Sequence, residues 1–152
     1  MNSLVARVDS LDRLIASRMA TIGIVFLRLS LGLIFFWFGA LKFFPGVSSA
    51  EELALRTITT LTFGVIPGKV SLILLALWET AIGLGLIFRV ALRAVILLLL
   101  LQMAGTFLPL IFFPHETFTH FPFVPTLEGQ YIIKNLVLIG AALVIGSTVR
   151  KL

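Results

Sequence analysis

The sequence lacks cysteine altogether, and only 12% of its 152 residues are charged. Without cysteine there is no disulfide, no thiolate nucleophile, no cysteine-ligated zinc and no iron–sulfur cluster. Soluble domains are about a quarter charged, whereas 59% of these residues are hydrophobic and the mean hydropathy is +1.13. This balance excludes an ordinary solvated globular domain.

The short motifs of several large enzyme classes are also missing. The sequence has no Walker loop, no dinucleotide-binding glycine fingerprint and no nucleophile elbow. No pair of histidines falls within the apolar runs, where two would be needed to ligate a haem from both sides. Any redox chemistry would therefore pass through a bound organic molecule or a partner protein.

Four apolar runs are each long enough to cross a bilayer, which takes about 20 residues. They cover residues 21–44, 70–88, 94–113 and 131–149. Proline–glycine pairs at 45–46 and 67–68 mark where helices end or begin. The sequence therefore predicts an all-α, four-transmembrane-helix bundle in a single membrane domain, residues 1–152. An arginine inside the first run and the length of that run argue against a cleaved signal peptide.

Two segments outside the runs are predicted to form helices that lie on the membrane surface. In residues 4–19, apolar side chains recur at helical spacing beside charged ones. In residues 50–63, the preceding Ser49 and Glu52 form the capping-box pattern that opens a helix. Both segments would place an apolar face against the bilayer or the bundle.

The net charge of +5 reports membrane topology rather than nucleic-acid binding. Seven lysines and arginines lie in the two terminal tails and in the 89–93 turn, against two in the loops 45–69 and 114–130. Cytoplasmic loops carry the excess of lysine and arginine. Both termini are therefore predicted to face the cytoplasm.

Four charged residues fall inside the predicted spans, where each costs about 2.5–3.5 kcal/mol on insertion scales. They are Arg28, Lys42, Glu79 and Lys134. In the first span, positions 28, 32, 35, 39 and 42 follow at spacings of four and three, so they share one face of the helix. Glycines at 32 and 39 allow another helix to approach this face closely, which indicates that it points into the bundle.

Polar residues on the other spans complete a predicted buried core. Gln102 and Asn135 join the four charges, and the long side chains of Arg28 or Lys134 are expected to reach Glu79. One acid cannot neutralise three cations. Two interpretations stay open: the ion pair fixes the register of the helices, or the surplus positive charge holds a small anion or the polar head of a quinone.

The loop 114–130, which this topology places on the outer side of the membrane, carries His115, His120 and Glu128. These residues are predicted to form a lid over the outer mouth of the bundle. Two histidines five residues apart are too loosely spaced to indicate a metal site. No metal is therefore predicted.

Three segments resemble the DoxX-like integral membrane proteins, near the reactive-chlorine-resistance branch of that family. Residues 27–45, LRLSLGLIFFWFGALKFFP, resemble the first helix. Trp78 and Glu79, followed by Gly83, resemble the glutamate-bearing second helix, and residues 129–142 with Lys134 resemble the lysine-bearing fourth helix. The loop between the first two spans is shorter than in that branch.

The resemblance implies a multi-pass protein of the bacterial inner (cytoplasmic) membrane with a redox association, since the namesake is described as the small membrane subunit of a thiosulfate:quinone oxidoreductase. The leading prediction is the membrane subunit or anchor of a redox- or stress-linked complex, at most a quinone-linked oxidoreductase subunit. A quinone is the candidate cofactor, and the candidate partners are a peripheral oxidoreductase subunit and a second copy of the chain. A small-molecule transporter or permeation protein and a non-catalytic assembly factor are the alternatives.

Overall fold

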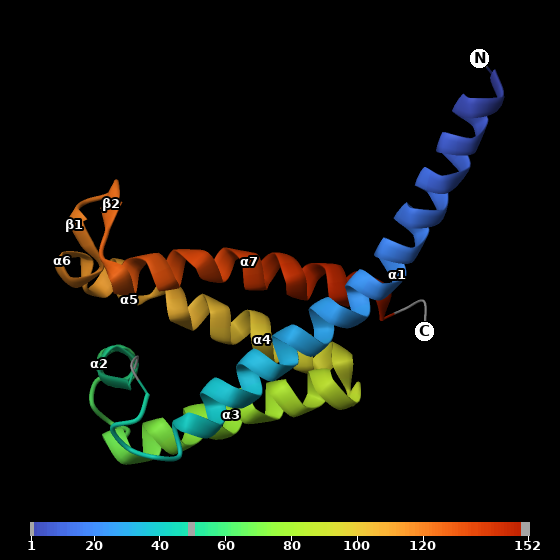
Figure 1. The fold of residues 1–152 in the computed structure, drawn as a ribbon. Coiled ribbons are helices and arrows are strands. Elements are labelled where there is room, and N and C mark those ends of the chain that lie inside the picture. The colour runs from blue at the N-terminus through green and yellow to red at the C-terminus, as the bar shows by residue number, and fades with distance from the viewer. Residues whose placement is uncertain (1, 49–50, 150–152) are drawn as a thin grey trace.

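The computed structural model describes residues 2–48 and 51–149, with the side chains of residues 2–7 left out. It is a bundle of long helices with one short hairpin at one end (Figure 1). The helices are α1 (Asn2–Leu41), α2 (Glu51–Leu61), α3 (Gly68–Phe88), α4 (Leu92–Phe107), α5 (Pro109–Phe112), α6 (Pro114–Thr117) and α7 (Leu127–Thr148). The strands β1 (Phe118–His120) and β2 (Val124–Pro125) pair in antiparallel fashion.

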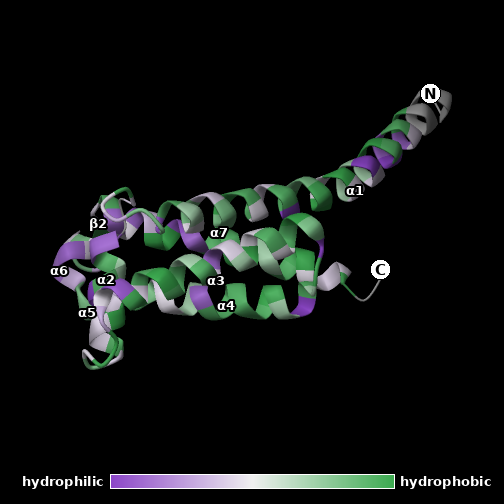
Figure 2. Cartoon of the chain, turned by 90° about the horizontal axis from the view of Figure 1, so that it is seen from below, coloured by the Kyte–Doolittle hydropathy of each residue, from purple (hydrophilic) through white to green (hydrophobic). Residues whose placement is uncertain are grey.

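Four helical stretches among the described residues are long and apolar enough to cross a membrane. They are Val8–Leu41, Gly68–Phe88, Leu92–Phe112 and Leu127–Thr148. Figure 2 shows these helices as mainly hydrophobic, with hydrophilic residues gathering towards the ends of the bundle. The predicted all-α bundle with four transmembrane helices is confirmed, and the chain is a multi-pass membrane protein.

The first predicted surface helix is not a separate element. Residues 4–19 are helical, but α1 continues from Asn2 to Leu41 without a break. The sequence offers no proline or turn motif between the two parts that could end the helix. The second predicted surface helix, 50–63, is observed as α2 (Glu51–Leu61), whereas the Ser49 of its capping box lies outside the described residues.

The loops at the α2 end of the bundle contain more structure than the sequence predicts. The third span bends at Leu108, because Pro109 begins the short helix α5. The predicted loop 114–130 contains α6, the hairpin and the start of α7. Helix α7 begins at Leu127 because the Thr126 side chain caps it, accepting a hydrogen bond from the Gly129 amide at 3.2 Å.

The two ends of the bundle differ in content (Figure 1). One end holds α2, α5, α6 and the hairpin, whereas the other holds the α3–α4 turn and the last turn of α7. The N-terminal part of α1 projects beyond this second end. We call the end with α2, α5, α6 and the hairpin the cap end, and the end with the α3–α4 turn the turn end. The two described basic segments, the N-terminal part of α1 and the α3–α4 turn, therefore lie at the same end, as the topology prediction requires.

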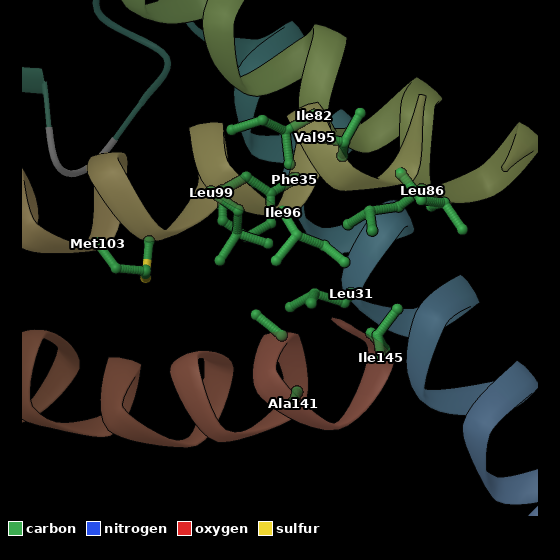
Figure 3. Close-up of a cluster of buried hydrophobic side chains, with 12 residues drawn as sticks. Leu31, Phe35, Ile82, Leu86, Val95, Ile96, Leu99, Met103, Ala141 and Ile145 are labelled. Atoms are coloured by element: carbon green, nitrogen blue, oxygen red, sulfur yellow. The ribbon is translucent and has the colours of Figure 1, made fainter. Parts of the chain in front are cut away.

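All four spans contribute to one apolar core, which lies in the half of the bundle nearer the turn end (Figure 3). Its members include Leu31 and Phe35 of α1, Ile82 and Leu86 of α3, Leu99 of α4, and Ala142 and Ile145 of α7. Helix α1 packs most extensively against α3. The apolar core holds the spans together nearer the turn end, whereas the buried Lys42 and Glu79 lie nearer the cap end.

Candidate functional site

Three of the polar residues predicted for the buried core form one hydrogen-bonded cluster. Lys42 Nζ lies 2.6 Å from Glu79 Oε2, and Gln102 Nε2 donates to Glu79 Oε1, also at 2.6 Å. The three residues are only 6%, 8% and 8% exposed. We call Lys42, Glu79 and Gln102 the polar triad. It joins α1, α3 and α4 at a single point.

Close contact between α1 and α3 positions the triad. A Cβ atom placed on Gly39 would lie 2.7 Å from the backbone nitrogen of Thr80, and one placed on Gly83 would lie 2.3 Å from that of Phe36. Such distances require glycine, and they bring the backbones of the two helices together. The Glu79 side chain leans towards the N-terminus of α3, where α1 ends and Lys42 follows.

The hydrogen bonds of the triad leave a Lys42 proton and the Gln102 amide oxygen without a described partner. Lys42 Nζ has three protons and donates to two described acceptors, Glu79 Oε2 and the Phe38 carbonyl at 3.3 Å. Gln102 Oε1 is buried without a hydrogen-bond partner in the described part of the chain. A buried acceptor left unpaired costs about 1–3 kcal/mol. The triad is therefore neutral overall but incompletely satisfied.

Arg28 does not reach Glu79, contrary to the prediction. Its guanidinium donates hydrogen bonds to the carbonyls of Leu86 and Ile87, the latter at 2.8 Å. These carbonyls lie roughly 11 Å along the helix axis from Glu79, at 1.5 Å per residue. The last carbonyls of a helix have no partner within the helix and attract a cation. Arg28 therefore caps the C-terminal end of α3.

Replacing this cap should measurably weaken the bundle. We expect Arg28→Gln to lower the free energy of unfolding by about 1–2 kcal/mol, because two helix-end carbonyls lose a charged donor. Unfolding of the purified protein in mixed detergent micelles, followed by tryptophan fluorescence, measures the change. Arg13→Gln is the matched control on the exposed part of α1. Equal stability of the two variants would contradict the capping role.

Lys134 and Asn135 also stay outside the triad. Lys134 is exposed, and its Nζ lies 5.5 Å from the centre of the Tyr131 ring. Asn135 Nδ2 donates to Thr106 Oγ1 at 3.4 Å and so links α7 to α4. Helical spacing places Lys134 on the same face of α7 as Ala141. The residues of α7 that pack into the apolar core lie nearer its C-terminus, however, so this face is not covered at Lys134. The predicted net-cationic core is therefore wrong, because two of its three cations lie elsewhere.

The predicted lid residues lie in the segments of the cap end. His115, His120 and Glu128 are all exposed. The described residues hold no group of three or more histidine or acidic side chains that could bind a metal ion. These three side chains therefore have no described contact that would make them part of the site.

An ion pair that the sequence analysis missed holds the cap together. Arg56 of α2 lies 2.7 Å from Glu116 of α6 and 4.5 Å from the centre of the Phe113 ring. The signal was weak, because Arg56 and Glu116 are 60 residues apart in two separate loops. Their pairing ties α2 to the segment that leads into α7.

Comparisons with known proteins do not assign this chain to a family, so a functional conclusion has to rest on the fold and the triad. The likeness to DoxX-like proteins stays a prediction from the sequence segments that carry it. No family model, no curated protein and no solved structure matches this chain.

Proposed function

We propose that this protein is a DoxX-like membrane subunit of a redox-linked complex and that its polar triad contacts the head group of a quinone. One observation carries the proposal: Gln102 Oε1 is a buried acceptor without a partner, next to a buried lysine–glutamate pair. An acceptor of this kind inside a membrane protein calls for a donor that the described residues do not supply. A quinol hydroxyl would be such a donor.

The triad offers both hydrogen-bonding senses that a quinone head group needs. The unused proton on Lys42 Nζ can be donated to a quinone carbonyl, and Gln102 Oε1 can accept from a quinol hydroxyl. Glu79 holds both residues in place through its two oxygens. A bound quinone would supply two-electron chemistry. Since no motif for a haem, flavin or iron–sulfur group is present, the electrons would come from a peripheral partner.

The geometry favours a quinone over a small anion. An anion would need surplus positive charge at the site, but Glu79 neutralises Lys42. Arg28 is engaged by the end of α3, and Lys134 is exposed. A neutral ligand with one acceptor and one donor group matches the neutral triad better than a charged one.

Quenching of tryptophan fluorescence by a short-chain quinone tests this proposal. Trp78 is adjacent to Glu79, and its Nε1 donates to the Leu98 carbonyl at 3.1 Å, so it reports on the α3–α4 contact. With Trp37→Phe as background, titration of the protein in lipid nanodiscs should show a saturable component. We expect Gln102→Leu to weaken this component about tenfold, because one buried hydrogen bond is lost.

Gln130→Leu is the matched control, since the same change is made on the exposed surface of α7. It should leave the saturable component unchanged, and circular dichroism should show that both variants remain helical. Quenching that rises linearly with quinone concentration, or equal binding by both variants, would contradict a quinone site at the triad. The triad would then act only in fixing the helices.

A further inference from the structure

A second polar feature lies at the turn end of the bundle, far from the triad. A cavity of about 370 Å³ opens between the start of α4 and the end of α7. It is lined by Arg93, Ile96, Gly146, Ser147 and Val149. Figure 1 shows the α3–α4 turn and the last turns of α7 side by side at this end. None of these residues contributes to the triad.

The lining of this cavity combines a cation with an apolar wall. Arg93 is exposed, and the described part of the chain gives its guanidinium no ion pair, since the two ion pairs found there join other residues. Among the described residues, the Ser147 hydroxyl bonds to the carbonyl of Val144, at 2.8 Å. Ile96 and Val149 provide the apolar wall. Among the described residues, no side chain caps the start of α4.

The helix segments that line the cavity, the start of α4 and the end of α7, supply no acidic side chain to balance Arg93. The sequence contains no aspartate or glutamate between Glu79 and Glu116, and none after Glu128. Arg89, in the same turn, lies within electrostatic range of Arg28. Three arginines thus gather at the turn end without a carboxylate from α3, α4 or the last turns of α7.

We propose that this cavity binds the phosphodiester of an anionic phospholipid. Arg93 would pair with the phosphate, the Ser147 hydroxyl would turn to donate to it, and an acyl chain would follow Ile96 and Val149. Basic pockets between transmembrane helices are known to hold anionic lipid head groups. Arg93 is the second residue of the Leu92–Phe112 span, which places it where head groups meet the hydrocarbon.

The apolar wall favours a lipid over free phosphate, although both present the same charged oxygens. Free phosphate would contact Arg93 but would leave Ile96 and Val149 uncovered. A phospholipid covers both parts of the cavity and is held at the membrane surface already. This site is independent of the proposed quinone contact, so either can fail alone.

Lipid retention measured by native mass spectrometry tests the proposal. The full-length protein, purified in detergent, is mixed with phosphatidylglycerol, with phosphatidylcholine, or with inorganic phosphate. We expect one phosphatidylglycerol to be retained preferentially. Arg93→Gln should weaken this retention about tenfold, because a charge-assisted contact is lost. Ser147→Leu, which fills the cavity without changing the charge, should weaken it as well.

Arg13→Gln removes the same charge from the exposed part of α1 and should retain the lipid as the parent does. Equal retention of phosphatidylcholine would contradict a site selective for anionic lipid. Binding of phosphate that matches that of phosphatidylglycerol would show a free-anion site instead. If the Arg13 and Arg93 variants lost the same share of phosphatidylglycerol retention, the change in net charge alone would explain the effect, and the proposal would be overturned. Since Arg93 and Ser147 are exposed, both variants should fold.

Discussion

Replacing Glu79 with leucine is expected to destabilise the folded protein by about 3–5 kcal/mol, the usual cost of removing one partner of a buried ion pair. The loss leaves Lys42 as an uncompensated cation at a site where it is only 6% exposed. Gln102 loses its acceptor at the same time, because its Nε2 donates to Glu79. The whole junction of α1, α3 and α4 is therefore affected by one substitution.

The double variant Lys42→Met/Glu79→Leu separates the cost of leaving Lys42 unpaired from the net contribution of the ion pair to stability. Replacing both charges with apolar side chains of similar size is often neutral or stabilising. We therefore expect the double variant to recover most of the stability lost by Glu79→Leu. Unfolding free energies in mixed micelles for the parent, the two single variants and the double variant give the coupling energy. Additive losses in the double variant would show that the two residues do not depend on each other.

Gly83→Ala is expected to have the second-largest effect, a loss of about 3 kcal/mol, at the upper end of the range for overpacked sites. The added Cβ would lie 2.3 Å from the backbone nitrogen and 2.6 Å from the Cα of Phe36. Backbone atoms cannot move aside as a side-chain tip can, so α1 and α3 would have to separate. This separation would also pull Lys42 away from Glu79.

Gly140→Ala provides the control, because a Cβ there meets nothing within 4 Å. Both glycines lie inside a transmembrane helix, so the change in helix propensity, about 1 kcal/mol in favour of alanine, is the same. The two variants therefore differ only in the clash. Thermal unfolding in the same detergent should place Gly83→Ala well below the parent and Gly140→Ala at or above it. Similar values for the two would mean that α1 and α3 can separate at little cost.

The spans could be predicted because hydropathy is a property of local sequence. Residues 70–88 were expected as a span, and α3 covers Gly68–Phe88. The helix predicted for residues 4–19 is observed, but it is continuous with the first span, because a change from mixed to apolar composition does not interrupt a helix when both parts favour helix. The bend at Leu108 follows from Pro109, whereas the hairpin depends on contacts between the cap segments, which no single stretch of sequence contains.

The three residues of the polar triad were among the six predicted for the polar core, but their pairing was not predicted. Helical spacing placed Lys42 and Glu79 on inward faces, whereas Gln102 was included as a polar residue of an apolar span. Spacing alone does not fix how far one helix is shifted along another, and this shift decides which cation meets Glu79. The glycine contacts set α1 so that Lys42 is level with Glu79, whereas Arg28 lies beside the end of α3. Lys134 faces inward by spacing but lies beyond the part of α7 that packs into the core.

The separation of Lys42 and Glu79 along the chain has a consequence for biosynthesis. The two residues are 37 positions apart, so at about 5–20 residues per second the lysine precedes its partner by roughly 2–7 s. Lys42 follows the last residue of α1 and can keep its amine among the lipid head groups during this time. Glu79 enters with α3 and meets a lysine that is already in the membrane. The order of the helices thus lets the first span insert before the Lys42 charge is buried and delays the ion pair until the second span arrives.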